Sequence, residues 1–97
     1  MARYLITYDV RSSDEDGPAR LRRVAKICES RGRRVQKSVF ECVLTDTQHH
    51  TFVSRLLDVI DPAADSLRIY RISEPLDEHL SVYGVDLSFD FTAPLIF

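Results

Sequence analysis

The chain has 97 residues, enough for one domain with a single two-layer core but not for a deep enclosed active site. Hydrophobic residues make up 44% of it and charged residues 29%, a balance that indicates a folded domain and excludes an intrinsically disordered one. No run approaches the roughly 18 apolar residues of a membrane span, and polar residues follow the N-terminus too soon for a signal peptide, so we expect a cytoplasmic protein.

The net charge of −2 conceals a strongly basic block. Residues 20–37 contain eight Lys and Arg against one Glu, whereas residues 38–97 contain three Arg against ten acids. Because the local field attracts polyanions, this block predicts contact with nucleic-acid phosphates. A solvated helix face is the alternative. No base-reading element is evident, so we expect binding to be largely independent of nucleotide sequence.

The first half of the chain predicts a strand, a polar loop and a helix. Residues 4–8 form a short β-rich run that ends at Asp9. From Ala19 to Ser30, apolar residues recur at helical spacing, and Gly32 is placed to end the helix in a left-handed cap. The candidate phosphate-binding residues in and after this helix are Arg20, Arg22, Arg23, Lys26, Arg31 and Arg34.

The second half of the chain predicts one or two strands, a second helix and a final strand. Residues 35–44 indicate either one long strand or two strands with a tight bend. Thr45 or Asp46 then caps a second helix, and residues 66–72 predict a further strand. With the bend, the order is β-α-β-β-α-β, an α+β ferredoxin-like fold with its helices on one face of an antiparallel sheet.

The C-terminal tail does not fit within this domain. Residues 85–91 alternate between apolar and polar, as in a half-buried strand, and an apolar chain end follows. We therefore divide the chain into a ferredoxin-like domain, residues 1–80, and a C-terminal strand and tail, residues 81–97. We expect the tail strand to pack on a second copy or on a complex subunit, because an unpaired sheet edge accepts a strand. The alternative is that the tail folds back onto its own sheet.

Asp9 is the best candidate for chemistry, because a carboxylate at a strand end is well placed to hold Mg²⁺, which takes oxygen ligands. One carboxylate makes a poor site, but a twofold axis near Asp9 would supply a second carboxylate and one shared metal ion. The alternative is that Asp9 caps a turn. Cys28 and Cys42 have no metal-binding or redox spacing, and we expect them to be reduced core residues.

Several of these residues occur in an order that is similar to the CRISPR-associated protein 2 family. The order is Tyr8-Asp9, an Arg-rich helix containing Arg23-Val24, Gly32, and then RVQKSVFE from Arg34 to Glu41. The chain end, residues 94–97, also resembles that of some members. The positions that match family residues linked to activity are Tyr8, Asp9, Arg23, Arg34, Ser38 and Phe40.

This resemblance implies a ferredoxin-like homodimer with exchanged C-terminal strands, in which Asp9 of both protomers binds one Mg²⁺. It also implies a metal-dependent endonuclease acting on RNA or double-stranded DNA. A further implied role is the bridge between integrase dimers of the CRISPR-associated protein 1 family during spacer acquisition.

These implications lead to two hypotheses. The first is a dimeric Mg²⁺ endonuclease in which Asp9 holds the ion while Arg23 and Arg34 hold the nucleic-acid backbone. The second is a twofold adaptor that spans duplex DNA through its basic helices and offers its tail edges to integrase subunits. We favour the second as the biological function. A toxin-like ferredoxin-fold endoribonuclease outside CRISPR systems is the remaining alternative.

Overall fold

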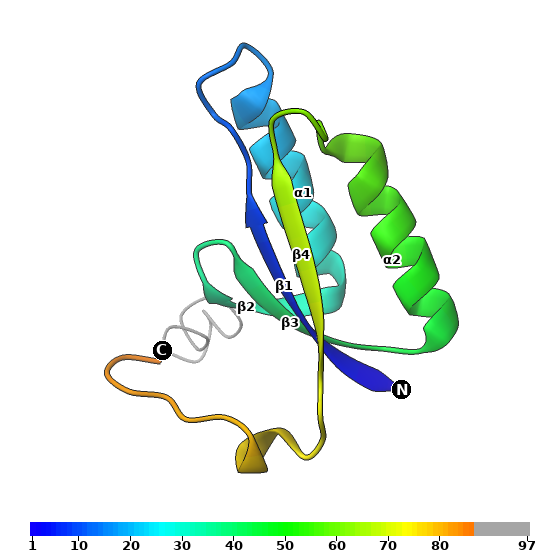
Figure 1. Ribbon diagram of the computed structural model, residues 1–97, viewed down its shortest axis with the longest axis vertical. Coiled ribbons are helices and arrows are strands. Elements are labelled where there is room, and N and C mark those ends of the chain that lie inside the picture. Colours follow the sequence, from blue (N-terminus) through cyan, green and yellow to red (C-terminus); the bar gives the residue numbers. More distant parts are fainter. Residues whose placement is uncertain (87–97) are drawn as a thin grey trace.

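The protein, seen here as a computed structural model, is described over residues 1–86 and forms one sheet with two helices (Figure 1). Its elements are β1 (Ala2–Asp9), α1 (Gly17–Arg31), β2 (Gly32–Gln36), β3 (Val39–Leu44), α2 (Asp46–Val59), β4 (Ser66–Ile72) and the 3₁₀ turn η1 (Leu76–Glu78). The predicted β-α-β-β-α-β order is confirmed, and residues 35–44 contain the tight bend rather than one long strand.

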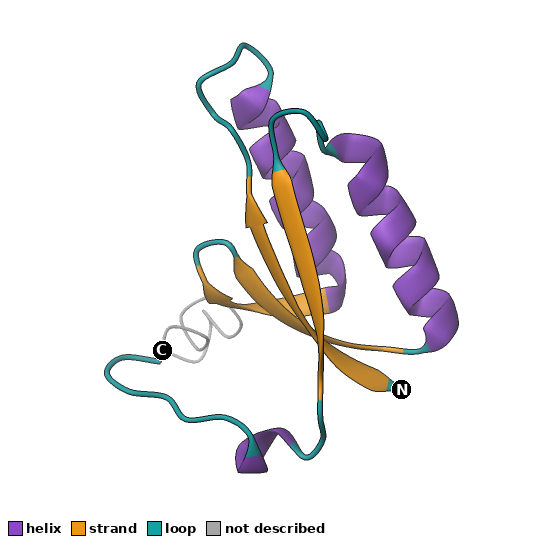
Figure 2. Cartoon of the chain, viewed as in Figure 1, coloured by secondary structure: helices purple, strands orange, loops and turns teal. Residues whose placement is uncertain are grey.

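The four strands form an antiparallel sheet in the order β2-β3-β1-β4, and both helices pack on the same side of it (Figure 2). Side chains of a strand alternate between the two faces of a sheet. In β1, Tyr4, Ile6 and Tyr8 are therefore buried against the helices, while Leu5 and Thr7 point to the other side. We call that side, which no helix covers, the open face.

The hydrophobic core lies between the sheet and the two helices. Its fully buried side chains come from every layer, and the largest of them are Phe40, Phe52, Ile6, Leu44, Leu56 and Val24. Cys28 of α1 and Cys42 of β3 are free thiols in the same core, as predicted. Burial raises the pKa of Cys28 to about 12 and that of Cys42 to about 11. Both cysteines therefore serve as small apolar residues.

The start of α2 follows directly from its sequence. The Thr45 hydroxyl accepts a hydrogen bond from the Gln48 backbone N–H at 3.1 Å, and the Thr45 backbone N–H donates to the Gln48 side chain at 2.9 Å. This reciprocal pair is a capping box, which satisfies two N–H groups that have no partner within the helix. Of the two residues predicted as the cap, Thr45 is the correct one.

The end of α1 differs from the prediction. Gly32 has φ −137° and ψ −174°, so it is extended and begins β2 instead of closing the helix in a left-handed cap. A Cβ atom at this position would lie 2.5 Å from the Cys42 Sγ atom and 2.8 Å from the Glu41 carbonyl oxygen. Gly32 is thus needed for the close approach of β2 to β3, not for an unusual backbone angle.

After β4, the chain passes through η1, and residues 80–86 run across the open face of the sheet (Figure 1). Most of the predicted tail strand, residues 85–91, and the whole apolar chain end lie outside the described residues, as does any exchange of this strand. Among residues 1–86, no helix is both long enough and apolar enough to cross a membrane.

Candidate functional site

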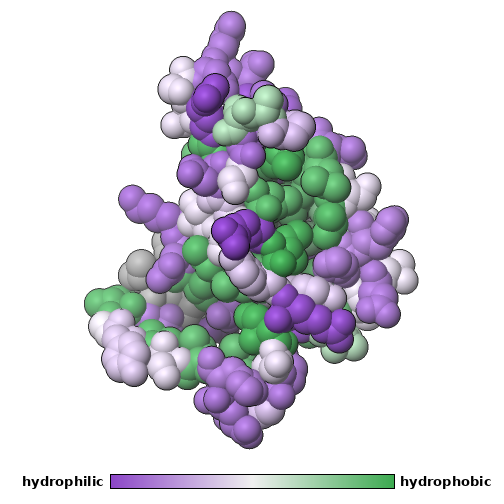
Figure 3. All heavy atoms as spheres, in the orientation of Figure 1, coloured by the Kyte–Doolittle hydropathy of each residue, from purple (hydrophilic) through white to green (hydrophobic). Residues whose placement is uncertain are grey.

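Asp9 is the last residue of β1 and is exposed to solvent. It lies opposite Ser66, the first residue of β4, and the alternation of β1 places it on the open face with Leu5 and Thr7. In the view of Figure 3, apolar side chains gather along the middle of the molecule and hydrophilic ones surround them. On the open face, Asp9 follows Leu5 and Thr7, whose side chains are half-buried.

Tyr8, the neighbour of Asp9, points the opposite way, into the core. Its ring is stacked with that of the fully buried Phe40, with 6.2 Å between ring centroids and 21° between planes. The Tyr8 backbone N–H donates to the carbonyl oxygen of Ser38, in the β2–β3 turn, at 3.1 Å. Tyr8, Phe40 and Ser38 are thus brought together, but the two aromatic side chains lie across the sheet from the Asp9 carboxylate.

Arg34 joins this buried group from β2. Its guanidinium carbon lies 5.0 Å from the centre of the Phe40 ring, and its Nη2 atom lies 3.7 Å from a carboxylate oxygen of Glu29 in α1. Burial raises the pKa of Tyr8, and a hydrogen bond with Arg34 opposes that rise. Arg34 consequently ties β2 to α1 on the helix side of the sheet and does not extend toward Asp9.

Arg20 occupies a different place from the one predicted for it. Its side chain is buried, and its guanidinium binds Asp65 through Nε at 2.9 Å and Asp14 through Nη2 at 2.8 Å. It also donates to the Arg11 carbonyl oxygen at 3.3 Å. We therefore remove Arg20 from the phosphate-binding surface, because its donors are already occupied by protein acceptors. One signal in the sequence was the spacing of Arg20, Val24 and Ile27, which puts Arg20 on the buried stripe of α1.

The remaining cations of α1 form an outward surface. Arg22, Arg23 and Lys26 are exposed, and none of them forms an ion pair within residues 1–86. We call these three residues the basic face. Arg31, at the end of the same helix, is also exposed. Since α1 packs its other side on the sheet, the basic face and the open face look away from each other.

The described part of the chain contains no complete cluster of metal ligands. Within residues 1–86, no three His, Cys, Asp or Glu side chains lie close enough together to hold an ion. The carboxylates of Asp14 and Asp65 are bound by Arg20, which lowers the pKa of both. Asp9 is exposed, and its carboxylate fits the oxygen ligands that a hard cation takes.

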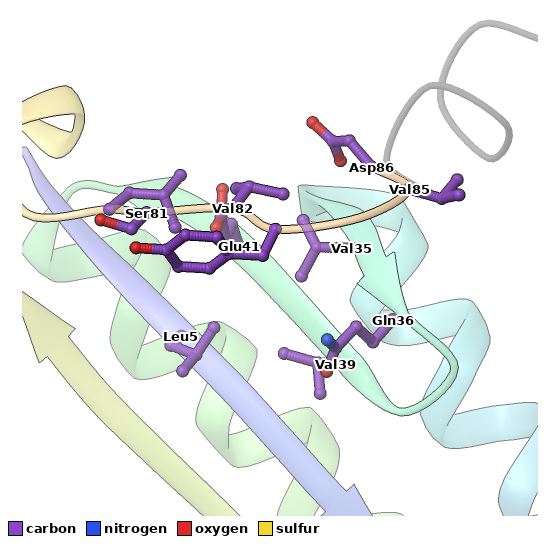
Figure 4. Close-up of a pocket in the computed structure, with 11 residues that line it drawn as sticks. Leu5, Val35, Gln36, Val39, Glu41, Ser81, Val82, Val85 and Asp86 are labelled. Atoms are coloured by element: carbon purple, nitrogen blue, oxygen red, sulfur yellow. The ribbon is translucent and has the colours of Figure 1, made fainter.

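A shallow hollow lies elsewhere on the open face, between the sheet and residues 80–86 (Figure 4). The side chains that line it from the sheet are Leu5, Val35, Gln36, Val39 and Glu41. Most of these are apolar, and the hollow does not include Asp9. The hollow is therefore a packing surface that is separate from Asp9.

These features define a small ferredoxin-like α+β protein with one basic helix and one exposed carboxylate at a strand end. Residues 1–79 match the family model described as CRISPR associated protein Cas2. The chain belongs to the Cas2 family.

The relatives agree with this assignment over almost the whole chain. The CRISPR-associated endoribonuclease Cas2 1 of Moorella thermoacetica is 52% identical over 92 residues, covering 95% of this chain and 96% of the relative. The CRISPR-associated endonuclease Cas2 of Halalkalibacterium halodurans is 46% identical, covering 96% of this chain and 97% of the relative. The crystal structure of Streptococcus pyogenes Cas2 superposes with a TM-score of 0.76 at 39% identity, covering 84% of this chain and 99% of that one.

Proposed function

We propose that this protein is a subunit of CRISPR adaptation: a homodimer that binds duplex DNA and bridges integrase dimers of the CRISPR-associated protein 1 family during spacer acquisition. The observation that carries the proposal is the opposition of the basic face and the open face across the molecule. If two copies meet through their open faces, their basic faces look outward in opposite directions. Such a dimer presents two phosphate-binding surfaces to duplex DNA, one on each side of the dimer.

The chemistry of the open face supports its use between copies. Val43 of β3 and Tyr70 of β4 are 41% and 43% exposed on it, Leu5 lies on β1 between these two strands, and Val39 lies at the other end of β3 on the same face. Removing apolar surface of this kind from water lowers the free energy of the protein, which favours its burial between two copies. The family match favours this CRISPR role over the toxin-like alternative.

A second candidate activity is metal-dependent cleavage of DNA or RNA. It is favoured by the position of Asp9 on the open face and by two relatives named as an endoribonuclease and an endonuclease. Asp9 of each protomer would hold a shared Mg²⁺ at the dimer axis. When bound, the ion would lower the pKa of a water molecule and stabilise charge on the scissile phosphate. Arg23 would hold the nucleic-acid backbone, whereas Arg34 contributes from within the fold.

The adaptor role is tested by duplex binding. The variant Arg22→Gln/Lys26→Gln removes two charges from the basic face, and Arg55→Gln/Arg71→Gln, as a matched control, removes two exposed charges elsewhere. We expect the first to weaken binding at least tenfold and to reduce the slope of log K against log salt by about 2, and the control to change little. Equal losses in both variants would refute a localised DNA surface.

Assembly with the integrase is tested separately, by deleting residues 85–97. We expect the truncated chain to lose the integrase complex while duplex binding by the basic face persists. Intact assembly by the truncated chain would refute the role of the tail.

The nuclease activity is tested with a labelled DNA duplex and an RNA strand, in Mg²⁺ or EDTA, by wild type and Asp9→Asn. Metal-dependent cutting that is lost in Asp9→Asn would support the activity and identify its substrate. No cutting by either protein, with duplex binding retained, would leave the adaptor as the function.

A further inference from the structure

One buried carboxylate, Asp65, is bound by four donors around the end of β1. Its side chain is 0% exposed and accepts hydrogen bonds from Arg20 Nε at 2.9 Å and Arg20 Nη2 at 3.2 Å. It also accepts from the backbone N–H groups of Arg11 at 3.0 Å and Asp61 at 2.8 Å. A buried charge with this many partners is rigid, because losing any one of them leaves a desolvated group unsatisfied.

The chain positions of these partners bring the network to Asp9. Asp65 immediately precedes Ser66, which lies opposite Asp9 in the β1–β4 ladder. Arg11, which donates to Asp65, is two residues beyond Asp9. The Asp65 carboxylate therefore holds the backbone two residues after Asp9, and Asp65 itself is the chain neighbour of the residue that pairs with Asp9.

Arg20 connects this arrangement to α1. Its planar guanidinium binds Asp65 on one edge and Asp14 on another, and its Nη2 atom donates to the carbonyl oxygen of Arg11. This bidentate geometry needs an arginine, because the ammonium of a lysine has no fork. We call Arg20, Asp14 and Asp65 the Arg20 clamp.

We infer that the Arg20 clamp positions Asp9 for its metal, so that Arg20 and Asp65 are positioning residues for the site. The inference rests on the metal-binding role of Asp9 proposed above. Two carboxylates that meet across a dimer axis must be held within about 0.5 Å of the productive geometry. Asp9 itself is exposed at the last position of its strand, and the clamp supplies the rigidity that its own side chain lacks.

The test compares two variants of the Arg20 clamp with a control substitution in another part of the fold. Asp65→Asn keeps the size of the side chain and removes its charge, while Arg20→Lys keeps the charge and removes the fork. The control is Thr45→Ala, which breaks the capping box of α2 beside Leu44, the residue that pairs with Ala2 at the other end of β1. Asp9→Asn, assayed in parallel, reports the direct loss of the metal ligand.

Three quantities are measured on each full-length folded protein. They are the affinity for Mn²⁺ alone, from the electron paramagnetic resonance signal of the free ion, the hydrogen-exchange rate of the Arg11 amide by NMR, and the affinity for a DNA duplex in EDTA. We expect both clamp variants to bind Mn²⁺ at least tenfold more weakly and to exchange the Arg11 amide at least tenfold faster. Duplex affinity in EDTA stays within twofold, and Thr45→Ala changes none of the three.

Several results would overturn the inference. Faster exchange at Arg11 with unchanged Mn²⁺ affinity means that the clamp orders the loop without positioning Asp9. Weaker Mn²⁺ binding with unchanged exchange, or an equal loss in Thr45→Ala, also contradicts it. A wild type that binds Mn²⁺ no better than Asp9→Asn refutes the proposed metal site and the inference with it, and this comparison does not involve the clamp variants. If Asp65→Asn does not fold, Asp14→Asn removes the more exposed partner and gives the same comparison.

Discussion

Asp9 and Tyr8 are consecutive in β1, yet their side chains lie on opposite faces of the sheet. The positions that match the family's activity-linked residues are divided in the same way, because Arg34 and Phe40 accompany Tyr8 on the helix side. The side chains of these three residues therefore contact one another on the helix side of the sheet and do not reach the Asp9 carboxylate. Loss of activity on their substitution does not require that they touch nucleic acid.

We predict that Arg34→Lys destabilises the fold more than it weakens duplex binding. A lysine cannot keep the planar stacking on Phe40 together with the hydrogen bond to Tyr8, so the free energy of unfolding should fall by about 1 kcal/mol. Urea unfolding measures this change, and duplex affinity should stay within twofold. The exposed Arg55→Lys is the control and should leave both quantities unchanged. A stable Arg34→Lys protein with tenfold weaker duplex binding would contradict the assignment.

Substitution of Gly32 by Ala should destabilise the protein by about 1–3 kcal/mol, as expected for overpacking a tight contact. The new Cβ atom would lie 2.5 Å from the Cys42 Sγ atom and 2.8 Å from the Glu41 carbonyl oxygen. A double-mutant cycle with Cys42→Ala should recover part of the loss, because the sulfur clash is relieved and the carbonyl clash remains. The idea fails if Gly32→Ala unfolds at the same urea concentration as wild type.

Acid should weaken the Arg20 clamp in a defined direction. Hydrogen bonds from Arg20 lower the pKa of both Asp14 and Asp65 in the folded protein. The folded state therefore binds fewer protons than the unfolded state, whose carboxyl pKa is about 3.9, and the added stability is present above that value and is lost as pH falls.

Urea unfolding between pH 3 and pH 7 measures this effect. Asp65→Asn, which lacks one of the two carboxyls, should show a smaller loss of stability over the acid range than wild type. Parallel pH profiles for the two proteins would show that the clamp does not contribute to acid sensitivity.

The two thiols should be unreactive in the folded protein. Cys28 and Cys42 are buried, and their pKa values are raised to about 12 and about 11, so little thiolate is present at pH 8. We expect no reaction with Ellman's reagent on the scale of minutes under native conditions and reaction of both thiols after denaturation. Rapid labelling of either cysteine in the native protein would contradict this packing.

The sequence predicted the elements of the fold well, because they depend on local signals. Helical spacing of apolar residues located both helices, and Thr45 was one of the two residues predicted to cap α2. Arg22, Arg23 and Lys26 were among the candidate phosphate-binding residues of this helix, and the structure shows them exposed. Each of these inferences needed residues within one or two helical turns of one another.

What the sequence did not predict depends on distant partners. Arg20 is buried because Asp65, 45 residues away, meets it between two loops, and no local pattern contains both residues. The family resemblance in the sequence pointed to Tyr8, Arg34 and Phe40. It did not show which face of the sheet they occupy, because that depends on strand register. Gly32 was assigned to a helix cap because its contact with Cys42 exists only after β2 and β3 pair.

The irregular pairing of β2 with β3 determines which residues the hairpin shows to each side. Arg34 lies opposite Phe40, but Gln36 lies opposite Val39, so Val35 is one residue more than a regular ladder would contain. This extra residue lets Arg34 face the helices while Val35 and Gln36 line the open face. Without the extra residue the strand would alternate strictly, and only one residue would occupy the part of the open face that Val35 and Gln36 now share. The length of this short segment is therefore under a stricter constraint than the identity of its side chains, and insertions or deletions there should be far less tolerated than substitutions.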